Sequence, residues 1–327
     1  MALTGATALP NIVIHKLGRT GLAVTNIALG TSPLGSSPNL YGYAVDEERA
    51  LDTIRAFFAG PLNFADTSNN YGQGRSERAI GKVIRELGGI PAGKVLATKV
   101  DANPETHDFS GDRVRRSAEE SLERLGIERF QLLHLHDPDL HMDFATGSRK
   151  GGAVDALVAL KEQGIAESIG IATGNLQALT DYLNTDVFDV LLSHNKYTLL
   201  DRSAEPLMDA CVHKGVAFLN AAPYGGGILA RGPGATTRYA YAEAAEELLK
   251  RATELEALCA RHEIPLAAAA LQFSMRDNRV TSTVLGASSR TRLEQTIALA
   301  ERPISAAFWQ AAEGLMASWR SNADRVE

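Results

Sequence analysis

The chain has 327 residues, of which 45% are apolar and 22% are charged, and its formal net charge is −6. This mix is typical of a globular protein with a sizeable core, and the negative charge argues against a surface that binds nucleic acid. Two cysteines are too few for a disulfide framework or a zinc site, and no apolar run reaches the roughly 20 residues of a membrane span. We therefore expect a cytoplasmic protein without membrane contact, in which residues 1–11 form a flexible tail.

Eight short β-rich segments alternate with longer helical patterns along the chain. The expected strands cover residues 24–31, 62–67, 94–100, 130–137, 166–173, 188–195, 216–223 and 280–288. The helices expected to follow them cover residues 46–60, 76–89, 110–126, 152–164, 175–185, 203–215, 242–263 and 290–302. The strands are apolar at both odd and even positions, which is typical of a parallel sheet covered by helices.

Eight strand–helix repeats without a break in composition predict a single (β/α)8 domain, the TIM barrel, over residues 1–327. Before the first strand, "HKLGRTGLAV" (15–24) has two glycines around a short polar turn, which predicts a β-hairpin at the bottom of the barrel. The run 308–320 predicts a C-terminal helix. A doubly wound open sheet is the alternative, but "GTSPLGSS" (30–37) does not supply its G-x-G-x-x-G fingerprint.

Ionisable side chains stand at the ends of three consecutive expected strands. Asp66 ends the second strand with Tyr71 just beyond it, Lys99 ends the third, and His136 ends the fourth. Active sites of such barrels lie at the carboxyl ends of the strands. A nearby ammonium lowers the pKa of a phenol from about 10, a carboxylate keeps that ammonium charged, and an imidazole can hydrogen-bond a substrate oxygen. These four residues therefore form a candidate proton-transfer site for a carbonyl or an alcohol.

Other interpretations of the same residues remain open at this point. The carboxylate could cap a turn, the phenol could pack on the barrel, and the lysine could reach the rim. A zinc site is also conceivable, because His134 and His136 share strand parity and His194 ends a later strand. A metal-dependent hydrolase would need more ligands at the later strand ends. The sequence therefore favours a site without metal, with His134 inside the barrel one layer below His136.

Three separated segments resemble motifs of the aldo-keto reductase superfamily, in the same order. "FADTSNNYGQGRSERAIGKVI" resembles its Asp-Thr…Tyr-Gly signature, "LATKV" its catalytic-lysine strand, and "FQLLHLHDPD" its catalytic-histidine strand. The resemblance extends over nearly the whole chain and implies hydride transfer to or from NAD or NADP. It implies Tyr71 as general acid/base, Lys99 as the group that lowers the pKa of Tyr71, and Asp66 as the partner of Lys99. His136 is implied to orient the substrate.

The resemblance also implies a nicotinamide cofactor across the last four strands. Three segments resemble those that hold the carboxamide, the pyrophosphate and the adenosine phosphate, which are, in this order, "SHNKYTLLD", "NAAPYGGGILA" and "VLGASSRTRLEQT". The implied cofactor-binding residues are His194, Asn195, Ala221, Pro223, Gly225, Gly226, Gly227, Gly286, Ser288, Ser289, Arg292 and Gln295. Ala221 replaces a tyrosine that many relatives stack on the nicotinamide. Gly286 replaces a lysine of many NADP-preferring relatives, which favours NAD while leaving NADP open.

Several segments resemble one branch of that family, which contains L-fucose, D-threo-aldose and L-galactose 1-dehydrogenases, with a pyridoxal 4-dehydrogenase near it. The resemblance implies oxidation of a cyclic sugar hemiacetal at C1 to a lactone, with Tyr71 as the base. Pyridoxal, which also forms an internal hemiacetal, and simple aldehydes reduced with NADPH are alternative substrates. A nucleotide-binding regulatory subunit is the alternative of a different class.

Overall fold

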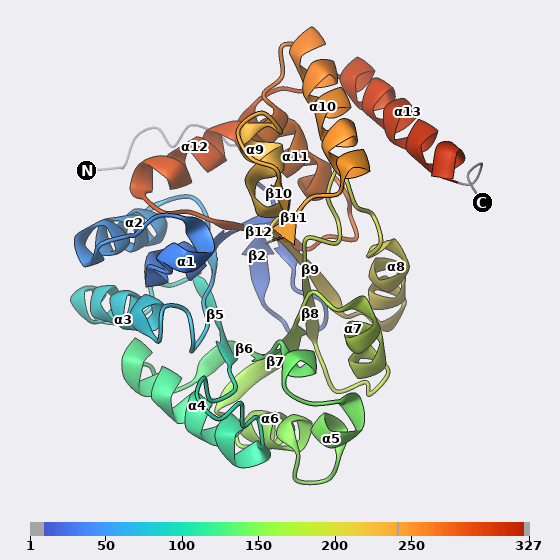
Figure 1. Ribbon diagram of the computed structural model, residues 1–327. Helices are drawn as coiled ribbons and strands as arrows, with labels where there is room; N and C mark the ends of the chain where they lie inside the picture. The colour runs from blue at the N-terminus through green and yellow to red at the C-terminus, as the bar shows by residue number, and fades with distance from the viewer. Residues whose placement is uncertain (1–9, 241, 324–327) are drawn as a thin grey trace.

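The computed structural model describes residues 10–240 and 242–323, in which parallel strands form a closed barrel inside a ring of helices (Figure 1). The barrel strands are β3 (Ile27–Gly30), β4 (Phe64–Asp66), β5 (Val95–Val100), β6 (Phe130–His136), β7 (Ala166–Ala172), β8 (Val190–His194), β9 (Ala217–Ala221) and β12 (Ser282–Gly286). Every neighbouring pair is parallel, and β12 closes the barrel between β9 and β3. The predicted (β/α)8 barrel is confirmed.

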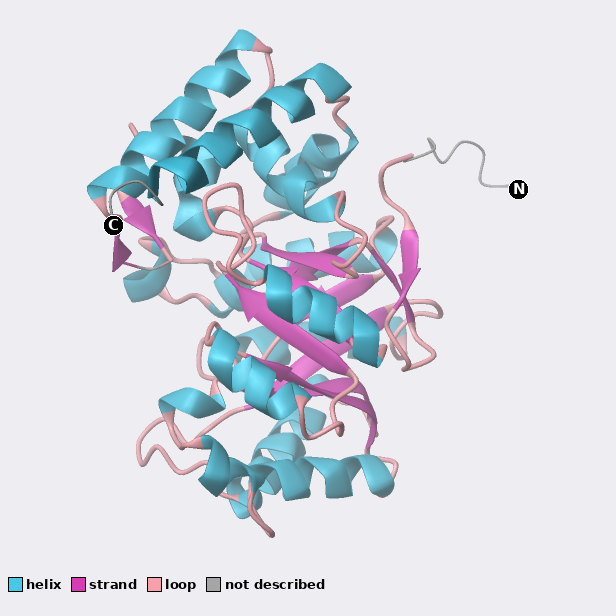
Figure 2. Cartoon of the chain, turned by 90° about the vertical axis from the view of Figure 1, so that its right-hand side faces the viewer, coloured by secondary structure: helices cyan, strands magenta, loops and turns pink. Residues whose placement is uncertain are grey.

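Helices follow each barrel strand and cover its outer face (Figure 2). The longer helices around the barrel are α2 (Glu47–Ala59), α3 (Arg75–Leu87), α4 (Gly111–Leu125), α6 (Ala153–Glu162), α7 (Leu176–Leu183), α8 (Glu205–Lys214), α11 (Leu266–Met275) and α12 (Arg290–Glu301). Short helical turns are η1 (Ser32–Gly35), α1 (Pro38–Tyr41), η2 (Pro138–Leu140), α5 (Phe144–Ser148), η3 (Gly225–Gly227) and α9 (Ile228–Arg231). No helix in the described ranges is long and apolar enough to cross a membrane.

The predicted hairpin is present as β1 (Ile14–Lys16) and β2 (Ala23–Thr25), which pair antiparallel. Leu17, in its turn, is fully buried and packs with interior barrel side chains such as Phe64. Gly18 has a φ of 54°, and a Cβ there would lie 2.7 Å from the backbone nitrogen of Ala217, at the start of β9. The turn therefore requires glycine, and the hairpin closes the amino-terminal end of the barrel.

The expected N-terminal tail lies mostly outside the described residues, which begin at residue 10. Asn11, the last residue of that tail, is tied to the end of α12. Its backbone N–H donates to the carboxylate of Glu301 at 3.1 Å, and its side-chain amide donates to the carbonyl of Ala300 at 3.1 Å.

The segment between β9 and β12 differs from the expected single helix. Residues Arg238–Tyr239 (β10) and Ala242–Glu243 (β11) form a short antiparallel pair, and α10 (Glu246–Arg261) begins only after it. The predicted C-terminal helix is confirmed as α13 (Ala306–Ala323), which packs against α10. The Trp319 indole donates to Glu254 of α10 at 2.7 Å, so Trp319 anchors α13 to α10.

The barrel interior changes from apolar to ionisable toward the carboxyl ends of the strands. Its lower part is filled by side chains such as Phe64, Val95 and Leu132. Above them, Lys99 of β5 pairs in register with His134 of β6, and His136 follows two residues later on the same strand. His134 is fully buried, one layer below His136, as predicted. This alternation places the ionisable groups together at one end of the barrel.

Candidate active site

The ammonium group of Lys99 joins a carboxylate and a phenol at the ends of β4 and β5. Its Nζ donates to Asp66 Oδ2 at 2.6 Å, to the Thr67 carbonyl at 2.7 Å and to the Tyr71 hydroxyl at 3.0 Å. The side chains of Lys99 and Asp66 are only 1% and 4% exposed. Because an ammonium has three donors, each of its protons has a protein acceptor. The structure therefore brings together three of the four residues that the sequence singled out.

The Tyr71 phenol does not have the acidity expected from the sequence. Burial raises the pKa of Tyr71 well above its ordinary value, and the carboxylate of Asp66 raises it further. The sequence predicted a lowered pKa, caused by Lys99. The predicted direction of the pKa shift is wrong, because desolvation disfavours the phenolate and Asp66 offsets the charge of the ammonium. The phenol therefore holds its proton at neutral pH.

The loop that carries Tyr71 is fixed by a close backbone contact. Gly72 has a φ of 60°, and a Cβ there would lie 1.8 Å from the carbonyl oxygen of Gly35 in η1. Only glycine fits at this position. The Tyr-Gly pair therefore places the phenol on a loop that packs tightly on the loop after β3.

His136 is oriented by two polar side chains. Its Nδ1 lies 2.7 Å from Asp101 Oδ1 and 3.0 Å from Ser68 Oγ, and Ser68 also donates to the other oxygen of Asp101. Since a carboxylate accepts only, Nδ1 carries the proton in this contact, which leaves Nε2 for a substrate oxygen. The ring meets that of Tyr71 edge-on, with centroids 5.7 Å apart. The fourth predicted residue thus belongs to the same site.

The charge of His136 depends on its carboxylate neighbours. Burial lowers the pKa of His136, but the carboxylates of Asp101 and Asp137 outweigh it, and the net pKa is raised. A raised folded-state pKa stabilises the protein below the ordinary imidazole pKa, and this contribution is lost as the pH rises through the raised value. His136 is therefore a cationic hydrogen-bond donor over a wider pH range than an ordinary histidine.

Replacement of Asp101 should weaken this effect. In Asp101→Asn we expect the pKa of His136 to fall, because the carboxylate in closest contact is lost, and the free energy of unfolding to depend less on pH near neutrality. NMR titration of the histidine ring protons, with His136→Gln to assign the signal, measures the shift directly. An unchanged His136 titration in Asp101→Asn would show that Asp101 does not set the charge of this ring.

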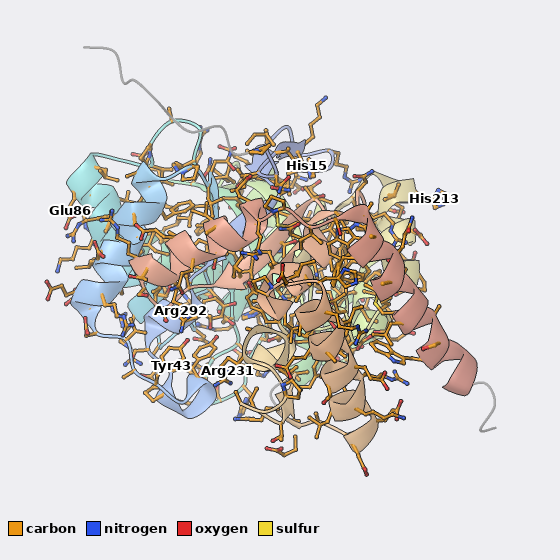
Figure 3. The ribbon with its side chains drawn as sticks, turned by 90° about the horizontal axis from the view of Figure 1, so that it is seen from above. His15, Tyr43, Glu86, His213, Arg231 and Arg292 are labelled. Carbon is orange, nitrogen blue, oxygen red and sulfur yellow. The ribbon has the colours of Figure 1, made fainter. Side chains whose placement is uncertain are left out.

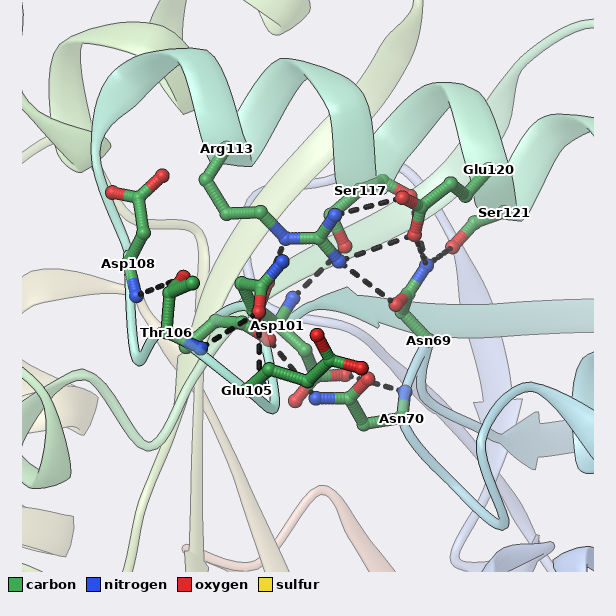
Figure 4. Close-up of polar contacts among 12 residues, drawn as sticks. Asn69, Asn70, Asp101, Glu105, Thr106, Asp108, Arg113, Ser117, Glu120 and Ser121 are labelled. Atoms are coloured by element: carbon green, nitrogen blue, oxygen red, sulfur yellow. Dashed lines mark hydrogen bonds and ion pairs between the residues drawn. The ribbon is translucent and has the colours of Figure 1, made fainter.

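A buried hydrogen-bond network on α4 supports both the loop that carries Tyr71 and Asp101, the partner of His136 (Figure 4). Arg113, only 6% exposed, donates to the Asp101 carbonyl at 3.0 Å, to Glu120 Oε1 at 2.7 Å and to Asn69 Oδ1 at 3.3 Å. Asn69 itself donates to three residues of α4, which are Ser117, Glu120 and Ser121. One helix therefore fixes the loop between Asp66 and Tyr71 and the backbone of Asp101.

Sequence reasoning missed Asp101, Ser68 and Arg113. Asp101 lies two residues beyond Lys99, where it could equally belong to the next loop. Arg113 is one of several arginines in its helix, and its burial is set by the fold. The one available signal was the Ser-Asn-Asn run after Asp66 and Thr67, an unusually polar segment directly after a buried strand.

The segments expected to bind the cofactor lie on β8, β9 and β12, which are consecutive in the barrel. The candidate proton-transfer residues lie on β4, β5 and β6 and on the loop after β4, across the same mouth. At the end of β9, Ala221 is in register with His194 of β8, and Pro223 is buried just beyond it. The order of strands therefore gives each half of the predicted site its own side of the barrel.

Asn195 has a buried acceptor without a partner. The residue is only 2% exposed. Its side-chain Nδ2 lies 3.1 Å from His194 Nδ1, whereas Oδ1 has no hydrogen bond within the described part of the chain. The neighbouring Ser193 hydroxyl is likewise buried and unpartnered within those residues. Buried polar atoms are normally satisfied. Asn195 therefore fits a ligand that donates a hydrogen bond, such as a carboxamide.

The glycine triplet is arranged differently from the expected phosphate cradle. Gly225, Gly226 and Gly227 have φ values of 57°, 76° and 110°. The N–H groups of Gly225 and Gly227 donate within the loop, to carbonyl oxygens at 3.0 Å, so they are already used. A Cβ on Gly225 would lie 2.3 Å from the Tyr239 ring, whose hydroxyl donates to the Asn195 carbonyl at 2.9 Å. The triplet thus leaves room for the Tyr239 ring of β10, whose hydroxyl binds the residue directly after β8.

The last predicted segment surrounds the start of α12. Ser289 is the N-cap and accepts from the Arg292 backbone N–H at 3.2 Å, and Ser288 precedes it. The Arg292 guanidinium is on the surface (Figure 3) and donates to Gln295 Oε1 at 3.0 Å. A Cβ on Gly286 would lie 2.9 Å from the Pro33 ring. Of the implied residues at this end, Arg292 is the one with a positive charge.

The alternative metal centre has no support from the placement of the histidines. His134 is buried below His136, and neither of its ring nitrogens has a hydrogen bond within the described ranges. Burial lowers the pKa of His134 well below its ordinary value, so the ring is neutral. Among residues 10–240 and 242–323, no three His, Cys, Asp or Glu side chains are placed to hold a metal ion together.

Comparison with known proteins gives a consistent family match. The model of the aldo/keto reductase family matches residues 26–317. A pyridoxal 4-dehydrogenase from Microbacterium luteolum is 31% identical, over 92% of this chain and 97% of its own. A D-threo-aldose 1-dehydrogenase from a Pseudomonas species is 30% identical, over 88% and 93%. An L-galactose dehydrogenase from Arabidopsis thaliana is 33% identical, over 88% of each chain.

A solved structure has the same fold. The holo form of an aldo-keto reductase from Bacillus halodurans superposes with a TM-score of 0.71, over 93% of this chain and 96% of its own. Its sequence is 21% identical to this one, so the likeness concerns the barrel architecture.

Proposed function

The chain belongs to the aldo/keto reductase family, and we propose that it is an NAD(P)-dependent dehydrogenase that oxidises the hemiacetal form of an aldose at C1 to the lactone. The contact that carries this proposal is the one between Lys99 Nζ and the Tyr71 hydroxyl, 3.0 Å apart inside the barrel mouth. The similarity to D-threo-aldose 1-dehydrogenase and L-galactose dehydrogenase supports an aldose as the substrate.

In this reaction Tyr71 moves the proton of the anomeric hydroxyl. A bound nicotinamide dinucleotide supplies the acceptor for the hydride of C1. The phenolate form of Tyr71 takes the hydroxyl proton, Lys99 stabilises that phenolate, and His136 Nε2 contacts the reacting oxygen, as a donor while the ring is cationic. Because burial raises the pKa of Tyr71, the phenolate becomes more populated as the pH rises, and we expect oxidation to be faster in alkaline solution.

The residues of β8, β9 and α12 fit a dinucleotide. Asn195 Oδ1, the unpartnered buried acceptor, would bind the carboxamide. Arg231 folds back on the glycine loop, with its guanidinium 3.1 Å from where a Cβ of Gly227 would lie, and would supply positive charge for the pyrophosphate. Arg292 at the start of α12 would meet the adenosine end. NAD is favoured over NADP because Gly286 provides no charge there.

The preference between nucleotides can be measured at Arg292. We expect Arg292→Ala to weaken NADP+ binding about tenfold, because a charge-assisted contact to the 2′-phosphate is lost, and to change NAD+ binding less than about twofold. Fluorescence titration of both nucleotides gives the two dissociation constants. Arg290→Ala is the matched control, since Arg290 is paired with Glu294 at 2.8 Å. An equal loss for both nucleotides would remove Arg292 from the phosphate site.

The substrate class is tested by a panel measured with both nucleotides. We expect cofactor reduction at alkaline pH with at least one of L-fucose, D-arabinose and L-galactose. Turnover of pyridoxal alone would favour the second candidate, oxidation of the pyridoxal hemiacetal, which the similarity to pyridoxal 4-dehydrogenase supports. NADPH oxidation with aromatic aldehydes, without any oxidation of sugars, would identify an aldehyde reductase and contradict the proposal.

A further inference from the structure

Asp137, directly after His136, has an unusual backbone conformation. Its φ and ψ are 43° and 46°, in the left-handed region, and Pro138 follows it. Aspartate adopts this region more readily than most residues other than glycine, but a following proline adds a further restriction. The backbone is held there by a hydrogen bond from the Asp137 N–H to the Ala172 carbonyl at 2.8 Å. Strained residues of this kind cluster at functional sites.

The Asp137 carboxylate stands between two imidazoles at the barrel mouth. Oδ2 lies 3.5 Å from His136 Nε2, and Oδ1 lies 4.0 Å from His194 Nε2. The side chain is 28% exposed. Although Asp137 occupies the N-cap of η2, its side chain makes no capping hydrogen bond. The carboxylate is therefore neither a helix cap nor part of the core.

The orientation of His136 does not require this second carboxylate. Asp101 already binds Nδ1 at 2.7 Å and fixes the ring. The 3.5 Å separation from Nε2 is too long for a strong hydrogen bond, so Asp137 leaves the Nε2 proton to the substrate. Each carboxylate oxygen of Asp137 keeps lone pairs for another donor. Water supplies that donor in the free protein, and a molecule bound at Nε2 would replace it.

We propose that Asp137 is a specificity-determining residue, which accepts a hydrogen bond from the hydroxyl on the carbon next to the reacting carbon of the substrate. The inference rests on the proposed function. An oxygen bound at His136 Nε2 would bring its vicinal hydroxyl toward Asp137 Oδ2, because vicinal oxygens on a sugar ring lie about as far apart as two hydrogen-bonded atoms. The site then selects aldoses with a C2 hydroxyl over 2-deoxy sugars and simple aldehydes.

The test compares each sugar with its 2-deoxy counterpart. For wild type, kcat/KM is measured with L-fucose and 2-deoxy-L-fucose, and with D-arabinose and 2-deoxy-D-ribose. We expect the parent sugar of the preferred pair to be favoured about 30-fold, the effect of one hydrogen bond to a charged acceptor. Asp137→Ala should reduce this ratio to about threefold or less, because kcat/KM falls more for the parent sugar than for its 2-deoxy counterpart. Asp137→Asn, which keeps an acceptor, should retain part of the preference.

Asp139→Asn is the matched control, because Asp139 lies in the same segment and accepts a hydrogen bond from Thr173 at 2.7 Å. It should leave the ratio unchanged. An equal fall of kcat/KM for both sugars in Asp137→Ala would mean that Asp137 acts only through the charge of His136, and would overturn this inference alone. Absence of turnover with all four sugars and with L-galactose in the wild type would overturn the proposed function and the inference with it.

Discussion

Tyr71→Phe is expected to lower kcat for sugar oxidation about a thousandfold, the effect of removing a positioned acid/base group. The substitution removes the hydroxyl that lies 3.0 Å from Lys99 Nζ and leaves the ring in place. Nucleotide binding should be unaffected, since the residues that fit the cofactor lie on β8, β9 and α12. Single-turnover kinetics and a fluorescence titration measure the two properties separately.

Tyr43→Phe provides the control, because Tyr43 is 43% exposed and lies outside the hydrogen-bonded cluster around Lys99. It should turn over sugar at the wild-type rate. Wild-type turnover in Tyr71→Phe would exclude the phenol as the proton acceptor. Separately, a wild type that oxidises no substrate of the panel would favour the regulatory-subunit interpretation.

Lys99→Met is expected to lower the free energy of unfolding by about 3–5 kcal/mol, because it leaves the carboxylate of Asp66 buried without its countercharge. The pair is almost completely buried, and Asp66 Oδ1 has no hydrogen bond within the residues that the structure describes. Urea denaturation followed by circular dichroism measures the loss. The double variant Asp66→Asn/Lys99→Met should be more stable than Lys99→Met, because it removes both charges.

A surface ion pair provides the control for the stability of the Lys99 variants. Lys82 contacts Glu47 at 3.1 Å with both side chains more than half exposed, so Lys82→Met should barely move the denaturation midpoint. If the double variant were no more stable than Lys99→Met, the unpaired carboxylate would not be the source of the instability. Both Lys99 variants should lack activity whatever their stability.

The barrel could be predicted because each strand is short, has apolar residues at both odd and even positions and is bounded by polar residues. Helix α11 could not be predicted, because its sequence lacks the helical pattern of apolar and polar residues. Its sequence, "LAAAALQFSM", is almost entirely apolar, since the helix packs between the barrel and its neighbouring helices, and it therefore shows no amphipathic period. The β10–β11 pair was also missed, because its strands of two residues leave no detectable alternation.

The residues of the proton-transfer site could be predicted from their positions at strand ends, but their supports could not. Asp101 and His136 are 35 residues apart and meet only because β5 and β6 pair with Lys99 opposite His134. The acidity of Tyr71 was predicted in the wrong direction, because the degree of burial, which dominates its pKa, depends on the packed loops around it. The resemblance implies that the glycine triplet approaches a phosphate, but two of its N–H groups donate within the loop.

We propose that the buried phenol beside Lys99 exchanges the proton of the reacting hydroxyl. The most direct measurement is the pH profile of kcat/KM for sugar oxidation, from about pH 6 to about pH 11, in wild type and Tyr71→Phe. We expect the wild-type rate to climb steadily into the alkaline range, and the residual rate of Tyr71→Phe to lack that rise. A wild-type profile that is flat or falls above neutrality, or the same alkaline rise in both proteins, would contradict it.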